Sequence, residues 1–179
     1  MNWTEEIDQT TAAFQVQFNA LTFEQLNWKP DSKTWSIAQN LDHLIRINES
    51  YFPIFELLKT GTYKTPLLSK IGFLVTFFGK FILKSVNPNR RKKMKTFRIW
   101  EPSQSEVPNI LERFQAHQSQ LKAQINSLQH WVDQGSVIHS PASATIVYKL
   151  EAAFDIIVSH EKRHLEQAKE VLDRHLKKI

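Results

Sequence analysis

The sequence predicts an all-α fold: an up-down four-helix bundle with an extra helical segment and a basic loop after the second helix. Glycine is scarce, at 4 residues in 179, while hydrophobic residues make up 41% of the chain. Long stretches repeat apolar residues at helical spacing, and the 7 prolines fall mainly between those stretches. Because 179 residues is a usual length for one domain, we expect residues 1–179 to form a single domain around one core.

The first helix is expected over residues 5–25. Thr4 can cap its start, and Glu5 and Glu6 suit the positive end of the helix dipole. An apolar stripe predicts that one face of this helix is buried against the core. The stripe consists of Ile7, Phe14, Phe18 and Leu21.

The second helix is expected to begin after Ser36, to run to about Lys59 and to stop before Gly61. Ser36 and Gln39 have the spacing of a capping box, in which the serine hydroxyl accepts from the third backbone N–H and the glutamine reaches back. The apolar stripe of this helix consists of Ile37, Leu41, Leu44, Tyr51, Phe55 and Leu58.

An apolar run at 67–83 predicts the extra helical segment. Polar residues interrupt the run at Ser69, Lys70 and Lys80. The run therefore falls short of the roughly 20 apolar residues that a membrane span needs. Because it is apolar on most sides, it is expected to be buried or to form a partner surface.

A basic run at 84–98 is expected to form a loop. It carries seven Lys and Arg residues and no acid: Lys84, Arg90, Arg91, Lys92, Lys93, Lys95 and Arg98. The other 164 residues carry 16 basic and 18 acidic side chains, so the net charge of +5 comes from this run. Stacking aromatic residues are lacking there apart from Phe97. We therefore expect a solvated loop, with no nucleic-acid partner and no membrane partner.

Residues typical of helix N-termini predict the last two helices. The Ser103–Glu106 stretch has the spacing of a second capping box and predicts a helix of about 28 residues that ends before Gly135. The Ser140–Pro141 pair predicts the start of the final helix, which extends to about Lys177, and no segment predicts a convincing sheet. Apolar residues of the third helix fall on heptad a and d positions: Val107, Leu111, Phe114, Leu121, Ile125, Leu128 and Val132.

The chain has no cysteine, which excludes disulfides, zinc–thiolate sites and a cysteine nucleophile. Its first residues, MNWTEEIDQTT, are polar and acidic and lack the apolar segment of a signal peptide. Both observations fit a reducing compartment. We therefore expect a cytoplasmic protein.

Two of the seven histidines, His160 and His164, stand four residues apart in the final helix. Side chains at this spacing lie one turn apart on the same face, so two imidazoles can each offer a nitrogen to one ion. On a helical wheel, His164 lies inside the apolar arc and His160 at its edge, so the pair faces the bundle interior, where bundles build metal sites. The same pattern also fits polar residues at the edge of a core.

The His160–His164 stretch, HEKRH, also matches the HExxH pattern of zinc proteases. In that chemistry Glu161 is the general base, and the helix lies in a cleft beside a sheet. The sequence predicts no such sheet. The zinc-protease interpretation stays an alternative, and Glu161 can act as a base only if it reaches an open coordination position.

His43 is the candidate for a third ligand. It lies at the margin of the apolar arc of the second helix, where it could also be a hydrogen-bonded core-edge residue. Asn40 precedes it by about one turn, and Asn48 lies near the centre of the stripe. Because inward-facing polar groups need a partner, water or an ion, these residues predict a polar pocket between the second and the final helix.

Two stretches of this chain resemble the DinB/YfiT-like family. The first is WSIAQNLDHL at Trp35–Leu44, preceded by Trp28-Lys29-Pro30; the second is the H-x-x-x-H-x-x-Q pattern at His160–Gln167. The resemblance covers about 1–60 and 104–179, whereas 62–100 matches only loosely. Each motif is short, but their order and separation are together fairly specific.

The resemblance implies a bundle with a metal site of His43, His160 and His164 that is open to water or substrate. It implies one divalent ion, with Zn and Ni favoured by the imidazole ligands. Members of the family often form homodimers, and their activities include transfer of low-molecular-weight thiols, bacillithiol or mycothiol. Gln167 could orient His164 or a bound water. No catalytic residue and no organic cofactor is assigned.

Three functions stay open at this point. The first is a metal-dependent transferase or hydrolase that acts on a small substrate, with thiol transfer as its sharpest version. The second is a non-catalytic, metal-stabilised bundle that binds a ligand or partner, with 67–83 as the partner surface. The third is a nucleic-acid or membrane binder that uses 84–98. Among the other histidines, His117 is a candidate fourth ligand or substrate contact, whereas His130, His139 and His175 are expected at helix ends or in loops.

Overall fold

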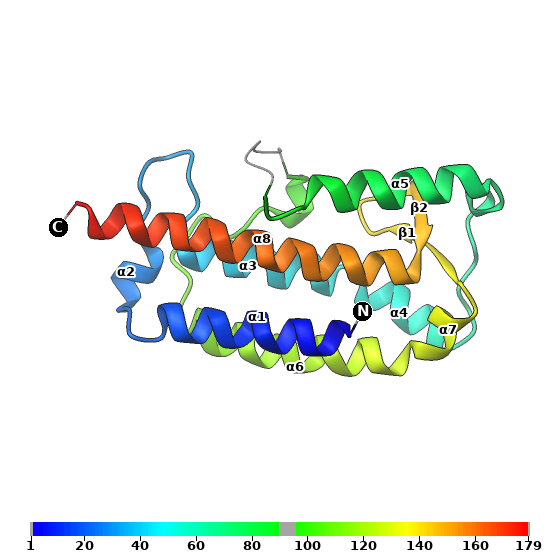
Figure 1. Cartoon of the computed structure of the whole chain (residues 1–179), viewed down its shortest axis with the longest axis horizontal. Coiled ribbons are helices and arrows are strands. Elements are labelled where there is room, and N and C mark those ends of the chain that lie inside the picture. The colour runs from blue at the N-terminus through cyan, green and yellow to red at the C-terminus, as the bar shows by residue number, and fades with distance from the viewer. Residues whose placement is uncertain (1, 90–95, 179) are drawn as a thin grey trace.

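The computed structural model describes residues 2–89 and 96–178 and is mostly helical (Figure 1). Its α-helices are α1 (Trp3–Phe18), α2 (Phe23–Asn27), α3 (Ile37–Glu49), α4 (Phe52–Lys59), α5 (Gly72–Ser85), α6 (Ile110–Ser127), α7 (Gln129–Asp133) and α8 (Leu150–Leu176). Two short 3-10 turns are η1 (Leu67–Lys70) and η2 (Arg98–Trp100), and an antiparallel hairpin is formed by β1 (Val137–Ser140) and β2 (Ser143–Lys149).

Helices α1, α3, α6 and α8 run alongside one another in the molecule (Figure 1). Helix α8 packs against α1 and α3, and α6 packs against the same two helices. Helix α5 lies on the outside, where it packs against α8 and β2. Helices α3 and α8 are therefore direct neighbours in space, although they lie far apart in the sequence.

The buried side chains form two apolar clusters with polar residues between them. On α8, the buried apolar residues from Leu150 to Val158 belong to one cluster, and Leu165, Ala168 and Val171 belong to the other. The polar residues of α8 that are buried between the two stretches are His160, Glu161, Arg163 and His164. Helices α3 and α6 add Asn48 and Gln118, which both hydrogen-bond to Glu161. The interior of the molecule therefore carries a polar layer.

The first two predicted helices are each divided in the structure. The helix expected over 5–25 ends at Phe18, and α2 begins afresh behind a capping box of Thr22 and Gln25. The helix expected to reach Lys59 breaks at Ser50–Tyr51, because Pro53 lies in the first turn of α4 and its ring is incompatible with a continuous helix there. The capping box of Ser36 and Gln39 is confirmed, with Gln39 N donating to Ser36 Oγ at 3.0 Å.

The capping box predicted at Ser103–Glu106 is wrong. Helix α6 begins only at Ile110, and Asn109 before it has a left-handed backbone with φ of 50°. Ser103 instead joins its segment to α3: its carbonyl accepts from Gln39 Nε2 and its N–H donates to Asp42 Oδ2. Pro108 also disfavours a helical conformation at the residue before it.

The predicted start of the final helix at Ser140–Pro141 is also wrong. Residues 137–149 form the β1–β2 hairpin, and α8 begins at Leu150. Val137, Ile138 and the 145–147 stretch are β-branched, a composition that favours strands. The expectation of no sheet therefore fails at one small hairpin, while the mostly helical character holds.

The extra helix predicted over 67–83 is present as η1 followed by α5. No helix in the described part of the chain is both long and apolar enough to cross a membrane. Of the basic run 84–98, which is predicted to form a loop, residues 90–95 lie outside the described residues. Lys84 and Arg98 on either side are exposed.

Candidate metal centre

His43, His160 and His164 come together between α3 and α8. Each offers one ring nitrogen to a group whose atoms all lie within 4.8 Å of one another. The ring centroid of His43 lies 5.1 Å from that of His160 and 4.8 Å from that of His164. All three side chains are buried. Among the described residues, this is the one group of His, Cys, Asp or Glu side chains with metal-ligand spacing.

Helical spacing explains why the two α8 histidines meet. His160 and His164 lie one turn apart, and their Nε2 atoms are 3.0 Å apart. Two nitrogens bound to one ion at roughly 2.1 Å each can be at most roughly 4.2 Å apart, so this separation is compatible with a shared ion. His43 comes from α3, which packs directly against α8.

A backbone carbonyl fixes the orientation of His43. The Nδ1 atom of His43 lies 2.6 Å from the carbonyl oxygen of Trp100. Because a carbonyl only accepts, Nδ1 carries the hydrogen and Nε2 keeps a lone pair. Trp100 is itself held by a hydrogen bond from its Nε1 to Ser50 Oγ at 3.0 Å.

A side-chain amide fixes the orientation of His164. Asn40 donates from Nδ2 to Ser36 O at 2.8 Å, which turns its Oδ1 towards His164 Nδ1 at 2.7 Å. The amide oxygen only accepts, so His164 also carries its hydrogen on Nδ1 and presents the Nε2 lone pair. Asn40 therefore takes the orienting role that the sequence suggested for Gln167.

Burial keeps the three imidazoles neutral. Loss of hydration lowers the pKa of His43 to about 4 and that of His160 and His164 well below the usual value for histidine. The charged forms of the neighbouring histidines and of Arg163 lower the pKa of His164 further. Metal binding needs neutral imidazole, so the cluster can bind an ion near pH 7 with no net loss of protons to solvent.

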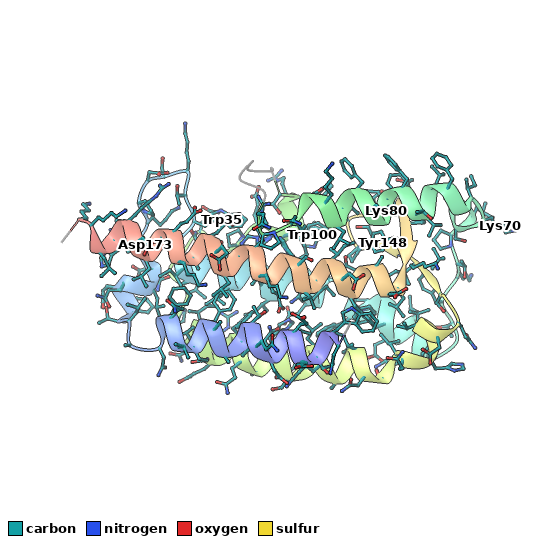
Figure 2. All side chains as sticks on the ribbon, in the orientation of Figure 1. Trp35, Lys70, Lys80, Trp100, Tyr148 and Asp173 are labelled. Atoms are coloured by element: carbon teal, nitrogen blue, oxygen red, sulfur yellow. The ribbon has the colours of Figure 1, made fainter. Side chains whose placement is uncertain are left out.

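The indole of Trp35 lies against the cluster. Its ring stacks on His164 with a centroid separation of 5.9 Å and an interplanar angle of 20°, and it lies 4.8 Å from the ring of His43. In Figure 2, Trp35 and Trp100 are seen on the side of α8 away from α1. The resemblance implied a site open to water or substrate, whereas the three histidines are buried and Trp35 is partly exposed.

Glu161 belongs to the polar layer and points towards α3 and α6. Its two carboxylate oxygens accept from Asn48 Nδ2 at 2.8 Å and from Gln118 Nε2 at 2.9 Å. Burial raises its pKa to about 7, although these hydrogen bonds oppose the shift. With both oxygens engaged by α3 and α6, Glu161 is not placed as the free general base that an HExxH protease needs.

The remaining histidines lie outside the cluster. His117 is buried on α6, where its ring stacks on Phe52 at 5.7 Å and its Nδ1 lies 4.0 Å from Glu49 Oε1. His130 contacts Gln134, His139 lies in β1, and His175 packs on Trp28. The structure therefore does not bring the suggested fourth ligand, His117, into the group of three.

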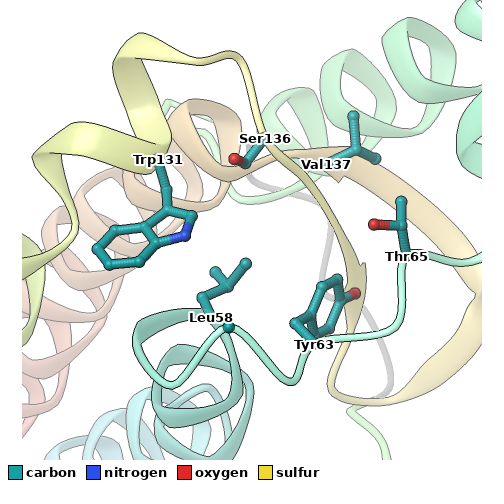
Figure 3. Close-up of a pocket in the computed structure, with 7 residues that line it drawn as sticks. Leu58, Tyr63, Thr65, Trp131, Ser136 and Val137 are labelled. Carbon is teal, nitrogen blue, oxygen red and sulfur yellow. The ribbon is translucent and has the colours of Figure 1, made fainter.

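A small pocket of about 250 Å³ lies elsewhere, between the ends of α4 and α7 and strand β1 (Figure 3). Its walls include Leu58, Tyr63, Trp131 and Val137. None of the three clustered histidines lines it. It therefore offers no direct entry to the metal centre.

Sequence reasoning found the three histidines but missed two of their supports. The Trp100 carbonyl is a backbone group, so the sequence carries no signal for it. For the contact of Trp35 with two imidazoles the sequence does carry a signal, because Trp35 opens the motif that includes His43. The pattern of α3 predicts that Asn40 faces inward and needs a partner, and His164 is that partner.

Comparison with known proteins adds one match. The family model of the DinB superfamily matches residues 6–168. Neither the curated proteins nor the solved structures gave a match. Because the matched region covers most of the chain and includes all three clustered histidines, the chain belongs to the DinB superfamily.

Proposed function

We propose that this chain is a metal-dependent enzyme of the DinB superfamily, in which His43, His160 and His164 bind one divalent ion. One observation carries the proposal: three buried, neutral imidazoles converge from two helices, and two of them have their hydrogens fixed on Nδ1. We further propose that residues 1–179 form one domain. In it α1, α3, α6 and α8 make a four-helix bundle that holds the site, as in other bundles whose metal ligands project from facing helices.

The donor set fits a divalent ion of borderline character. Imidazole nitrogen suits Zn and Ni, and three neutral ligands leave the full positive charge of the ion on the site. His164 Nε2 holds a lone pair, so His160 Nε2, 3.0 Å away, donates to it in the absence of an ion. Binding an ion through both atoms therefore requires His160 to move its hydrogen to Nδ1.

The proposed reaction acts on a small substrate, with transfer of a low-molecular-weight thiol as its sharpest version. When bound, a divalent ion supplies Lewis acidity and favours the deprotonated form of a ligand such as a thiol. The lack of cysteine is consistent with this, because the nucleophile would then come from the substrate. Trp100 and Asn40 hold the imidazoles in place, and the apolar clusters exclude water from the interior.

In this proposal, Trp35 controls access to the three histidines. It contacts two of the three histidine rings and is itself partly exposed, so a change of its rotamer would uncover them. Substrate binding would then select an open arrangement that is a minor state of the free protein.

The experiment is a conjugation assay with the metal-loaded protein. Purified protein is loaded separately with Zn or Ni and tested with a panel of low-molecular-weight thiols and small electrophiles. The proposal expects turnover that disappears in His43→Ala and His160→Ala and persists in His130→Ala, a matched change outside the site. Normal turnover in the two site variants would refute the thiol-transfer version.

A non-catalytic, metal-stabilised bundle is the second candidate, favoured by the burial of all three histidines. A bound ion would then stabilise the folded state by mass action and raise Tm. This candidate expects a higher Tm with metal and no turnover with any member of the panel.

A further inference from the structure

The outer face of α5 is aromatic and exposed. Phe73, Phe77 and Phe81 repeat every four residues, so they lie on one face, and they are 71%, 51% and 56% exposed. Figure 1 shows α5 at the outer edge of the molecule, away from α1 and α6. A stripe of this kind on a helix costs hydration free energy unless something covers it.

Further exposed apolar residues lie before and after α5 in the sequence. Leu67 and Ile71 precede α5 and are 80% and 45% exposed, and Phe97 and Ile99 follow it at 53% and 61%. Seven of the eleven large apolar side chains that are exposed among the described residues therefore lie within 67–99. We call the described residues 67–85 and 97–99 the α5 face.

Basic residues lie on and beside the same stripe. The described ranges 57–89 and 96–100 contain six Lys and Arg residues, of which Lys59 pairs with Glu56, and no Asp or Glu. Lys70, Lys80, Lys84 and Arg98 are exposed on or beside the α5 face. Figure 2 shows Lys70 and Lys80 at α5 and the turn before it, apart from α1 and α6.

The other side of α5 is fixed to the body of the molecule. Val75 and Gly79 are buried, and a Cβ at Gly79 would lie 3.4 Å from Ala152 Cβ and 3.5 Å from Tyr148 Cβ. Arg163 Nη1 donates to the carbonyls of Ser85 and Asn87 at 3.3 and 3.2 Å, so the end of α5 is joined to α8. The exposed stripe is therefore held outward by packing on its opposite side.

We propose that the α5 face docks the protein onto an anionic membrane surface, with α5 lying in the plane of the interface. Phenylalanines then enter the boundary between headgroups and acyl chains, while lysines extend to the lipid phosphates. No helix of the described chain can cross a bilayer, so the contact is peripheral. This proposal revises the expectation of no membrane partner, which rested on the basic run without the exposed aromatic stripe.

The positive charge of the α5 face argues against a second copy of this chain as the partner that covers it. A two-fold symmetric dimer places the same patch on both subunits, so it would bring the basic residues of the α5 face against each other. An anionic bilayer instead satisfies the apolar and the basic character of this face together. Nucleic acid would leave the exposed aliphatic side chains of this face, Leu67 and Ile71, without an apolar partner.

The test is co-sedimentation of the full chain with phosphatidylcholine vesicles that contain or lack phosphatidylglycerol. We expect binding that needs phosphatidylglycerol and weakens as salt is raised. The double variant Lys80→Glu/Lys84→Glu should bind at least about tenfold more weakly, as expected for charge reversal near an anionic surface. The triple variant Phe73→Ser/Phe77→Ser/Phe81→Ser should bind weakly even at low salt.

Matched controls separate the α5 face from general effects. Lys33→Glu/Lys177→Glu makes the same change in charge at exposed positions outside the α5 face, and Phe23→Ser changes an exposed phenylalanine of α2; both should bind as the parent does. The lysine variants leave the core untouched, so they test the proposal even if the triple variant unfolds.

Two results would overturn the proposal. The first is absence of binding to anionic vesicles, or binding that the α5 variants and their controls share equally. The second is a dimer, seen by analytical ultracentrifugation, that the lysine or phenylalanine variants dissociate, since the face would then be a self-association surface. Neither result bears on the metal centre, which is tested by metal content.

Discussion

His164 and Asn40 are joined across the interface of α8 and α3 by a hydrogen bond of 2.7 Å between Nδ1 and Oδ1. The two residues lie 124 positions apart in the sequence, so only the fold creates this contact. It leaves the Nε2 lone pair of His164 facing His160 and His43. The metal centre therefore depends on a residue that cannot itself be a ligand in this arrangement.

Replacing Asn40 should weaken metal binding without removing a ligand. Loss of such a partner of a ligating histidine costs about 10- to 100-fold in metal affinity, because the imidazole loses its fixed tautomer and orientation. We expect that loss in Asn40→Ala, measured by competition with a chromogenic chelator. Gln167→Ala should bind metal as the parent does, and an equal loss in both variants would contradict the assigned role of Asn40.

Glu161 should matter for stability and not for metal content. Glu161→Ala leaves Asn48 and Gln118 with unpaired donors inside the polar layer, so the free energy of unfolding should fall by at least about 2 kcal/mol. Denaturant titration measures the loss, and Glu166→Ala, an exposed change on the same helix, is the control. Metal content that drops with Glu161→Ala would show that this carboxylate acts at the metal after all.

His117 should make stability depend on pH. Burial lowers the pKa of His117 to about 4 from its ordinary value of about 6.5. Within the described residues its ring nitrogens lack hydrogen-bond partners, and Glu49 Oε1 lies 4.0 Å from Nδ1. Between these two values the unfolded chain binds the proton and the folded chain does not. Stability from this residue is therefore complete above about pH 6.5 and is lost as the pH falls towards 4.

The variant His117→Leu removes that contribution. The loss of stability between pH 7 and pH 5 should be smaller than in the parent by about 2 kcal/mol, as linkage predicts for this shift. Urea titrations at the two pH values, with His130→Leu as an exposed control, give the difference. The prediction fails if parent and variant lose the same stability on acidification.

Trp35 should control the rate of metal exchange. Trp35→Ala uncovers the rings of His43 and His164, so we expect a chelator to remove the ion faster than from the parent, with a smaller change in equilibrium affinity. Stopped-flow mixing with excess chelator measures the rate. Trp131→Ala, which changes a partly buried indole at the distant pocket, should leave the rate unchanged.

Sequence patterns predicted the parts of this fold that depend on local chemistry. The capping box of Ser36 and Gln39 and the i, i+4 pair of His160 and His164 are properties of single helices, and both appear in the structure. The predicted start of α6 was wrong because the Ser103 segment makes its hydrogen bonds to α3 and does not cap a helix. Such long-range competition is not visible in a local pattern.

The residues of the site could likewise be predicted from local patterns, whereas their arrangement in space could not. His43 could be paired with the α8 histidines through resemblance to a family motif, but its position opposite them comes from packing of α3 on α8. The Trp100 carbonyl that orients His43 lies in the region that matched the family only loosely. The β1–β2 hairpin was missed because Ser140–Pro141 is equally suited to start a helix and to make a turn.

The most direct test of the metal centre is the metal content of the protein, purified without an affinity tag and measured by inductively coupled plasma mass spectrometry. A site of His43, His160 and His164 predicts about one equivalent of Zn or Ni in the parent and in His130→Ala, and loss of the ion in His164→Ala. A parent protein that holds no metal after incubation with each ion, or a His164→Ala variant that retains the full equivalent, would contradict it.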